Sequence, residues 1–217
     1  MAQYKNGIET KNRILQTAKE LFYKHGFQKT TIAMIAEKAS VPVGLVNYYY
    51  KKEELIGKIH YNLTLSINKV IDEQLSGKIE NHLQKHVIYT HLFYRKIGSD
   101  PVNKNLYHTI IEKNLVAQET HDYVRSSMMA IISEFNLSIE MVVFKKMMIA
   151  EYGAREALLI DAFKQSDFNL SNDFINFLAT ITVRLTGIST MIIEDNIKKA
   201  EKLLPLVDTS SIYFFDS

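Results

Sequence analysis

A short stretch of the chain, residues 47–52, gathers amide, hydroxyl and ammonium groups: Asn47, Tyr48, Tyr49, Lys51 and Lys52. Tyrosine hydroxyls and lysine ammonium groups suit phosphate oxygens, and such contacts position a protein on a nucleic acid without reading its sequence. The amide of Asn47 can hydrogen-bond either a base edge or a phosphate. The chemistry that these side chains predict is therefore contact with a DNA duplex.

The residues just before this stretch suit the approach to base edges. Val43 and Leu45 can make only apolar contacts, for instance with thymine methyl groups. Gly44 lets the backbone come close to a ligand, because it has no side chain. Further upstream, the start of a helix near Thr30 and Thr31 offers free N–H groups to an anion. The predicted DNA-binding residues are Thr30, Thr31, Val43, Gly44, Leu45, Asn47, Tyr48, Tyr49, Lys51 and Lys52.

Three helices are expected to position these side chains. An amphipathic stripe predicts the first, with Asn6 or Thr10 as its cap, Gly26 as its left-handed stop, and the apolar residues Ile14, Leu15, Ala18, Leu21 and Phe22. A second stripe follows the threonine pair and is interrupted by Pro42, since proline lacks an N–H group. Its apolar residues are Ile32, Ile35, Ala36 and Ala39.

The third helix is expected from Val43 to about Tyr50. At 100° per residue, Tyr50 points into a small core with Phe22 and Ile35, whereas Tyr48 and Tyr49 point outward. Two short helices joined by a tight turn are typical of a helix-turn-helix, whose second helix can enter a major groove. A generic three-helix packing unit with exposed tyrosines remains the alternative at this point.

The charge distribution separates this region from the rest of the chain. Residues 1–58 contain ten Lys and Arg against five acidic residues, a net charge of +5 in a chain of 217 residues whose total is +2. The remainder is therefore mildly acidic, at −3. A basic head on an acidic body is typical of a polyanion-binding protein, although chance clustering on a solvated surface is the alternative.

Composition narrows the remaining function classes. The chain has no cysteine, which excludes a disulfide framework and a thiolate metal site and fits a reducing cytoplasm, where we expect the protein to act. The sequence shows no signal-peptide core and no membrane-spanning apolar run. No phosphate loop, nucleophile elbow or paired catalytic carboxylates occur, so we predict no enzyme activity, no catalytic residues and no cofactor. The pairs His82/His86 and His108/Glu112 lack a third ligand, so no metal site is predicted.

The segments Thr30–Val41, Gly44–Lys51 and Lys52–Leu55 together resemble the N-terminal signature of the tetracycline-repressor (TetR) family of transcriptional regulators. The resemblance implies an all-α homodimer with a helix-turn-helix DNA-binding domain, residues 1–51, and a ligand-binding and dimerisation domain, residues 52–217. It also implies that a small-molecule effector releases the protein, a repressor, from its DNA operator. Two features depart from the family pattern. The first is Val43, which stands where a polar residue is commoner, so we expect few hydrogen bonds to base edges. The second is the link between Tyr50 and Glu53, which is one residue shorter than is usual in the family. The register of Lys51 and Lys52 on the DNA phosphates is therefore left open.

The body is predicted to be helical over residues 52–75, 80–97, 101–116, 119–135, 138–165 and 171–203. Aromatic and methionine side chains on its central helices suit a mostly apolar ligand cavity with polar groups such as His91, His108 or Glu112. The predicted ligand-binding residues are Tyr89, Phe93, Tyr107, Ile111, Tyr123, Phe144, Met147 and Met148. The rival interpretation is an α-helical ligand-binding or enzymatic protein whose basic head makes protein contacts.

The last two predicted helices carry the pattern of a helix–helix interface. The final one has a heptad seam of six residues: Phe174, Leu178, Ile181, Leu185, Ile188 and Ile192. The one before it has a strip of small residues: Ala150, Gly153, Ala154 and Ala157. We expect a homodimer through these two helices, the alternative being that both stripes pack within one subunit.

Overall fold

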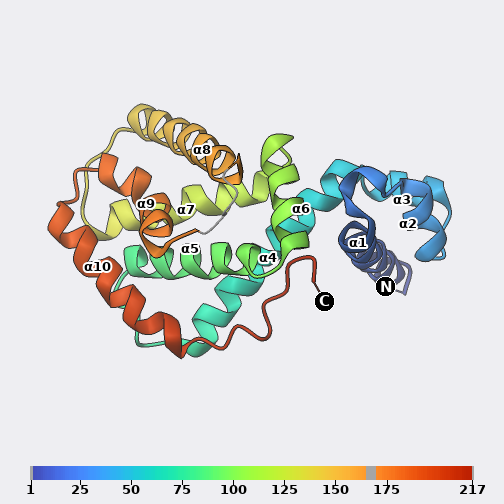
Figure 1. Ribbon diagram of the computed structural model, residues 1–217, viewed down its shortest axis with the longest axis horizontal. Helices are drawn as coiled ribbons and strands as arrows, with labels where there is room; N and C mark the ends of the chain where they lie inside the picture. Colours follow the sequence, from blue (N-terminus) through green and yellow to red (C-terminus); the bar gives the residue numbers. More distant parts are fainter. Residues whose placement is uncertain (1, 165–169, 217) are drawn as a thin grey trace.

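The computed structural model describes residues 2–164 and 170–216. Within them the chain forms α-helices and one short 3₁₀ helix, with no strand, which confirms the all-α prediction. The helices are α1 (Ala2–Lys29), α2 (Ile32–Lys38), α3 (Val43–Tyr49), α4 (Lys52–Gln74), α5 (His82–Gly98), α6 (Pro101–Glu112), α7 (Gln118–Glu134), α8 (Met141–Lys164), α9 (Asn172–Leu185), α10 (Thr190–Leu203) and η1 (Leu204–Leu206). Figure 1 shows α1, α2 and α3 grouped at one end, with α4 extending from this head into the body.

Helix α1 is longer than predicted. It begins at Ala2, so neither Asn6 nor Thr10 caps its start, and that prediction is wrong. Its regular part does stop at Gly26, where φ is 79° and ψ is 162°. That region of backbone space is open essentially to glycine alone, which explains why the chain turns there.

Thr30 and Thr31, in the turn before α2, make different hydrogen bonds. The Thr31 side chain caps α2 by accepting a hydrogen bond from the Met34 N–H at 3.2 Å. The Thr30 hydroxyl instead donates to the carbonyl oxygens of Leu21 and Gly26, at 3.1 and 2.9 Å, so it fastens α2 to α1. Pro42 then stands as the residue before α3, as its fixed φ angle favours.

The head has its own small core, built from the predicted stripes. Ile14, Phe22, Ile35 and Val46 are completely buried in it. Tyr50 packs against this core while remaining half-buried. The three helices are therefore positioned by apolar residues on their inner faces, which leaves the opposite edge of α3 to solvent.

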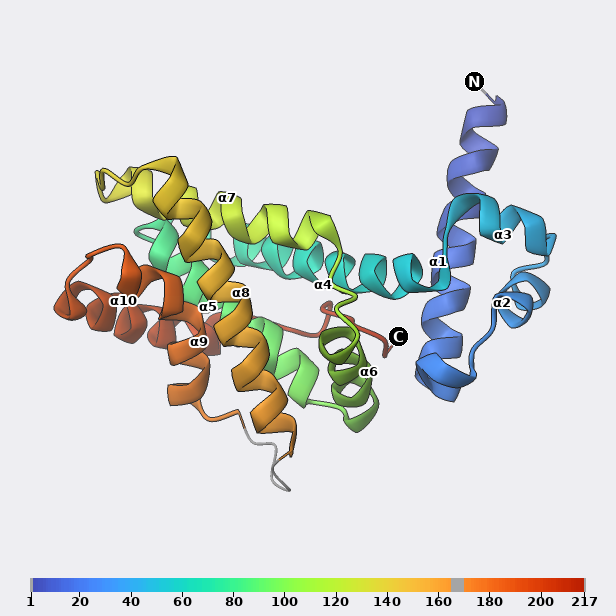
Figure 2. The same ribbon diagram turned by 90° about the horizontal axis from the view of Figure 1, so that it is seen from above.

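Helix α4 carries the head into the body, as Figure 2 shows. Its apolar face is buried along its whole length, at Leu55, Ile59, Leu63, Ile67 and Ile71. The centre of the body is α5, which packs against α4, α6, α7, α9 and α10. This central helix supplies several of the side chains of the cavity described below.

The predicted single helix over residues 171–203 is wrong. The structure has α9 and α10 in its place, separated at Gly187, where φ is 88°, with Ser189 capping α10 through the Ile192 N–H. The heptad seam is broken as a result: Leu178 is buried within the subunit, whereas Leu185 is exposed. The predicted break at residues 167–172 lies in part outside the described residues.

Residues 207–216 form an extended segment that returns from η1 to the junction of head and body (Figure 1). Phe214 and Phe215 are both buried, and the Phe215 ring lies 6.4 Å from that of Phe22 on α1. Asp216 binds Lys96 of α5 at 2.5 Å and accepts a hydrogen bond from the Asn103 amide of α6. The segment therefore joins the head to two helices of the body.

No helix in the described parts of the chain combines the length and hydropathy that a membrane span requires.

Candidate functional site

The outward edge of α3 is the first candidate site. Tyr48 is 79% exposed and Val43 46% exposed, and Gly44 and Asn47 are exposed beside them. Leu45 is half-buried, and Val46 on the opposite edge is fully buried. One edge of this helix thus holds it to the head while the other presents apolar, amide and hydroxyl groups outward. Figure 1 shows α2 and α3 at the end of the molecule farthest from the body.

Gly44 is open to solvent rather than packed. A Cβ atom at this position would meet no described atom within 4 Å beyond its own helix and neighbours. The fold of the free protein therefore does not require glycine at this position. A glycine here is consistent with a binding partner that approaches the backbone of α3 closely.

Tyr49 departs from the predicted outward orientation. It is half-buried, its ring centroid lies 5.1 Å from that of Tyr48, and the Lys11 ammonium group lies 5.2 Å from its ring centroid. Tyr49 thereby supports Tyr48 from the side of α1. Lys11, which the sequence patterns did not single out, is brought next to this face by α1.

The structure corrects the position of Thr30. It is completely buried, and both of its hydroxyl contacts are internal. A direct contact between its side chain and DNA is therefore wrong. Thr31 is exposed at the N-terminus of α2, but its side-chain oxygen is already used as the cap.

The two lysines after Tyr50 differ from each other. Lys51 is exposed immediately before α4. The Lys52 ammonium group lies 4.4 Å from the centroid of the Phe27 ring and donates to the Gln28 carbonyl at 3.4 Å, and burial lowers its pKa. The short link therefore turns Lys52 back onto the end of α1, so Lys51 is the freer of the two for a phosphate contact.

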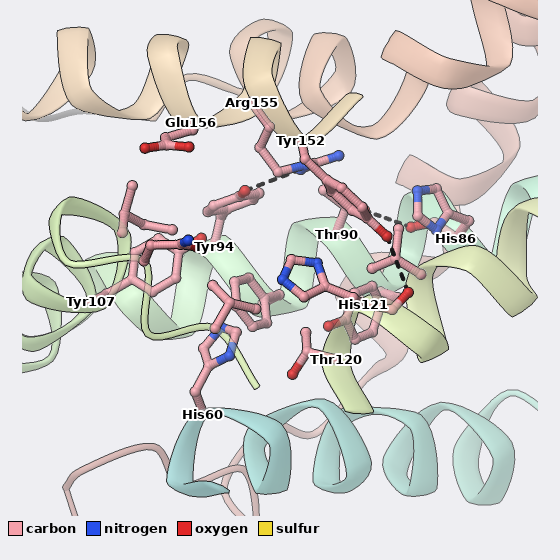
Figure 3. Close-up of a pocket in the computed structure, with 16 residues that line it drawn as sticks. His60, His86, Thr90, Tyr94, Tyr107, Thr120, His121, Tyr152, Arg155 and Glu156 are labelled. Carbon is pink, nitrogen blue, oxygen red and sulfur yellow. Dashed lines mark hydrogen bonds between the residues drawn. The ribbon is translucent and has the colours of Figure 1, made fainter. Parts of the chain in front are cut away.

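The second candidate site is a cavity of about 130 Å³ inside the body, shown in Figure 3. Helices α4, α5, α6, α7 and α8 surround it. Its lining consists of His60, His86, Tyr89, Thr90, Phe93, Tyr94, Tyr107, Ile111, Asn114, Val116, Thr120, His121, Val124, Tyr152, Arg155 and Glu156. Of these sixteen residues, five are Tyr or Phe and three are His, and Thr, Asn, Arg and Glu side chains add further polar groups.

His60 is the unusual polar group of this cavity. It projects from α4, is only 3% exposed, and stacks on Tyr107 with 5.7 Å between ring centroids. Neither of its ring nitrogens has a hydrogen-bond partner among the described residues, and the same holds for the Thr120 hydroxyl. Burial lowers the pKa of His60 to about 3, with a smaller contribution from His121, so the ring is neutral. An unpaired buried polar atom is costly, which makes these atoms candidates for a ligand.

Arg155 is engaged by three protein groups. Its guanidinium pairs with Glu151, donates to the Tyr94 hydroxyl at 3.0 Å, and donates to the Leu178 carbonyl at 2.6 Å. Glu151 is buried and also accepts a hydrogen bond from Thr182 at 2.8 Å. This network joins α8 to α5 and α9, and it neutralises the arginine charge beside the cavity.

Half of the predicted ligand residues lie at the cavity. Tyr89, Phe93, Tyr107 and Ile111 line it. Tyr123, Phe144, Met147 and Met148 are not among its described lining residues, so their assignment is corrected. The α8 positions that reach the cavity lie further along the helix, at Tyr152, Arg155 and Glu156.

The polar groups of the cavity also differ from the predicted His91, His108 and Glu112. His60, His86, Thr120 and His121 take their place. His60 had one signal in the sequence: it interrupts the apolar face of α4 between Ile59 and Leu63. In the described parts of the chain, no group of three or more His, Cys, Asp or Glu side chains is arranged to hold a metal ion.

Comparison with known proteins gives results for the head and for the fold. Residues 14–59 match the family model of "Bacterial regulatory proteins, tetR family". The chain is 36% identical over 84 residues to the "Uncharacterized HTH-type transcriptional regulator YerO" of Bacillus subtilis, and 30% identical over 91 residues to the regulator YhgD of the same species. These alignments cover 37% and 41% of this chain but only 29% and 48% of the two relatives.

Solved structures resemble the chain over nearly its whole length. RolR in complex with the ligand resorcinol matches with a TM-score of 0.63, 18% identity, and coverage of 96% of this chain and 100% of RolR. The tetr regulator tylp from Streptomyces fradiae matches with a TM-score of 0.56, 14% identity, and coverage of 95% of this chain and 99% of tylp. At these identities the likeness establishes a shared fold.

Proposed function

We propose that the chain, whose residues 14–59 match the tetR family of bacterial regulatory proteins, is a member of that family and a DNA-binding transcriptional repressor released by a small ligand. The observation that carries this proposal is the division of α3 into a buried edge at Val46 and an exposed edge at Gly44 and Tyr48. That edge offers a major groove what a recognition helix needs: a close backbone and short or flat side chains. We place its action in the cytoplasm and propose residues 1–51 as the DNA-binding domain.

Its contacts divide into two kinds. Val43, Gly44, Leu45 and Asn47 lie where base edges would be reached. The exposed Tyr48 hydroxyl and Lys51 ammonium group lie where they suit phosphates, which carry most of the affinity and its dependence on salt. Because Val43 cannot donate a hydrogen bond, sequence reading rests on apolar contacts, Asn47 and the shape of the DNA.

The body, residues 52–217, is the proposed ligand-binding and dimerisation domain. The aromatic cavity supports a small-molecule effector, and the fold relative RolR holds the ligand resorcinol. Apolar side chains stand outward on α8 and α9, among them Ile149, 71% exposed, and Phe177, 47% exposed, next to the exposed Gly153. We propose that a second copy covers them, giving two heads for two half-sites.

The proposed coupling between the two sites runs through α4. A Cβ at Gly57 would lie 2.8 Å from the Leu115 carbonyl oxygen, so α4 touches the loop between α6 and α7 backbone to backbone. Asn114 and Val116 of that loop line the cavity. A ligand that moves this loop therefore moves α4, and with it the spacing of the two heads. Such coupling is typically about 1–3 kcal/mol.

A duplex-binding experiment tests this function. Bound fragments would be selected from a random duplex pool, and the affinity of the selected DNA measured by fluorescence polarisation at several salt concentrations. We expect a steep negative slope of log affinity against log salt, because lysines displace counterions. Tyr48→Phe should weaken binding without loss of fold, since its hydroxyl is exposed; Tyr61→Phe on α4 is the matched control. Absence of duplex binding at low salt favours the rival, a helical ligand-binding or enzymatic protein whose head makes protein contacts.

A further inference from the structure

We infer that the ligand of the body cavity is a neutral, single-ring aromatic molecule carrying a hydroxyl group, a compound of the phenol class. The inference rests on the proposed function and names the chemistry of its effector. Three observations carry it: the size of the cavity, its aromatic walls, and the unpaired hydrogen-bonding atoms of His60 and Thr120.

The size of the cavity sets the size of the ligand. Its volume is about 130 Å³. An apolar protein cavity of about 150 Å³ holds a benzene molecule. One aromatic ring with one or two small substituents therefore fits this space.

The walls of the cavity suit the faces and edges of an aromatic ring. Tyr89 and Phe93 lie with ring centroids 5.8 Å apart, and Phe93 and Tyr107 meet edge to face at 5.7 Å. Tyr152 enters from α8 and is held by a hydrogen bond from its hydroxyl to the His121 carbonyl at 3.1 Å. Figure 3 shows Tyr107 and Tyr152 entering from different helices around one space, so that a flat ring can contact both.

The unpaired atoms require a ligand group that both donates and accepts. A neutral imidazole has one N–H donor and one nitrogen acceptor, and in His60 both lack a described partner. The Thr120 hydroxyl, also unpaired, can donate or accept. A hydroxyl group on the ligand can hydrogen-bond either nitrogen of His60, because it carries one proton to donate and two lone pairs that accept. Toluene, which has the same ring, leaves all these atoms unpaired.

The charges around the cavity favour a neutral ligand. A carboxylate would need a free cation, yet Arg155 is already engaged by Glu151, Tyr94 and the Leu178 carbonyl. Burial lowers the pKa of His60 and of His86, so neither supplies a positive charge. A cation on the ligand would lack a buried carboxylate partner, because Glu151 is already paired with Arg155 and the one lining carboxylate, that of Glu156, is exposed to water.

The position of His60 gives such a ligand a route to the head. His60 is part of α4, and its ring also lies 6.3 Å from that of Phe214. Phe214 is followed by Phe215, which lies against Phe22 of α1. A hydroxyl bound to His60 therefore acts directly on the helix and the segment that join the body to the DNA-binding head.

The experiment titrates the intact protein with phenol, toluene and benzoate at neutral pH by calorimetry, and repeats each titration on three variants. His60→Leu removes both ring nitrogens at similar volume, and Thr120→Val removes the hydroxyl without changing shape. Tyr123→Phe is the control, since its hydroxyl bonds Asn68 and does not line the cavity. We expect phenol to bind at least about tenfold more tightly than toluene, and benzoate to bind most weakly. His60→Leu should abolish the preference for phenol, Thr120→Val should reduce it, and Tyr123→Phe should retain it.

Three results overturn the inference: no binding of phenol, tighter binding of benzoate or toluene than of phenol, or an unchanged phenol preference in His60→Leu. Circular dichroism of each variant first establishes that it is folded; should His60→Leu not fold, His60→Phe, which keeps a ring but has no hydrogen-bonding atom, takes its place with the same expected loss. Duplex binding without any ligand is measured in parallel. A protein that binds the selected DNA but ignores phenol refutes the ligand class alone, whereas one that binds phenol but no DNA refutes the proposed function.

Discussion

The substitution Gly44→Ala separates the requirements of DNA binding from those of folding. In the free protein the new methyl group meets no described atom within 4 Å beyond its own helix and neighbours. Alanine is also the better helix former, by up to about 1 kcal/mol. The free energy of unfolding should therefore stay constant or rise by up to that amount.

The same methyl group should impair DNA binding, because it stands on the exposed edge of α3, where the backbone is proposed to approach base edges. A lost base contact costs about 1–3 kcal/mol. That range corresponds to a 5-fold to 150-fold weaker affinity for each head, by the factor of ten per 1.4 kcal/mol.

Two assays on one preparation would test this: urea unfolding followed by circular dichroism, and polarisation of a labelled, selected duplex. Gly57→Ala is the matched control, since its methyl group would lie 2.8 Å from the Leu115 carbonyl oxygen and should destabilise the fold. Unchanged DNA affinity in a folded Gly44→Ala protein would refute our placement of α3, and so would unfolding caused by Gly44→Ala.

Three further predictions concern the body. Arg155→Met should lower stability by about 3–5 kcal/mol, because it leaves the Glu151 carboxylate buried without its partner; Glu151→Leu added to it should restore most of the loss in urea titrations, and no recovery would contradict the network. Stability should fall as pH is lowered from 7 to 5, by up to about 1 kcal/mol per pH unit for each buried histidine. The sign follows because the unfolded chain binds protons near pH 6.5, whereas the folded pKa values of His60 and His86 are about 3 and about 4. His60→Leu should give a shallower curve, and an identical slope would show that His60 is not the linked group. Phe215→Ala should cost about 3–5 kcal/mol and expose the junction of head and body to limited proteolysis; a wild-type digestion pattern would show that the segment does not hold the head.

The architecture of the head was predictable because its signals are local. Gly26 has a backbone conformation that other residues avoid, Thr31 caps the next helix through its own side chain, and Pro42 interrupts the chain before α3. Each acts within a few residues of its own position. The orientation of α3 followed from one buried position, Val46, at helical spacing from the exposed ones.

The split of the last predicted helix was missed because a heptad pattern does not reveal its own interruptions. Apolar residues continue at 4-3 spacing through Leu185 and Ile188, yet Gly187 takes a positive φ angle and Ser189 starts a new helix. The glycine and serine were the available signals, and the apolar periodicity outweighed them. A seam of this kind specifies contacts only if the helix is continuous.

The cavity could not be assembled from sequence because its polar groups come from distant parts of the chain. His60 on α4 and Thr120 on α7 meet only through tertiary packing, and neither lies in a motif. Aromatic and methionine content predicted that the body would be apolar inside, but not which turn of α8 faces the space. Burial of Thr30 was missed for a different reason: its partners are nearby, but its hydroxyl turns inward to the Leu21 and Gly26 carbonyls of α1 and not outward with that of Thr31.

The central claim, that the exposed edge of α3 lies in a groove of duplex DNA, can be tested by tethered cleavage. Because the chain has no cysteine, Val43→Cys creates a single attachment point for an iron chelate that cleaves nearby DNA. Leu206→Cys on η1 of the body is the control, since Leu206 is 55% exposed and Val43 is 46% exposed. Our account predicts cleavage within the selected operator, at positions clustered on the major groove, from residue 43 and none from residue 206. Cleavage from residue 206 with none from residue 43 would contradict it.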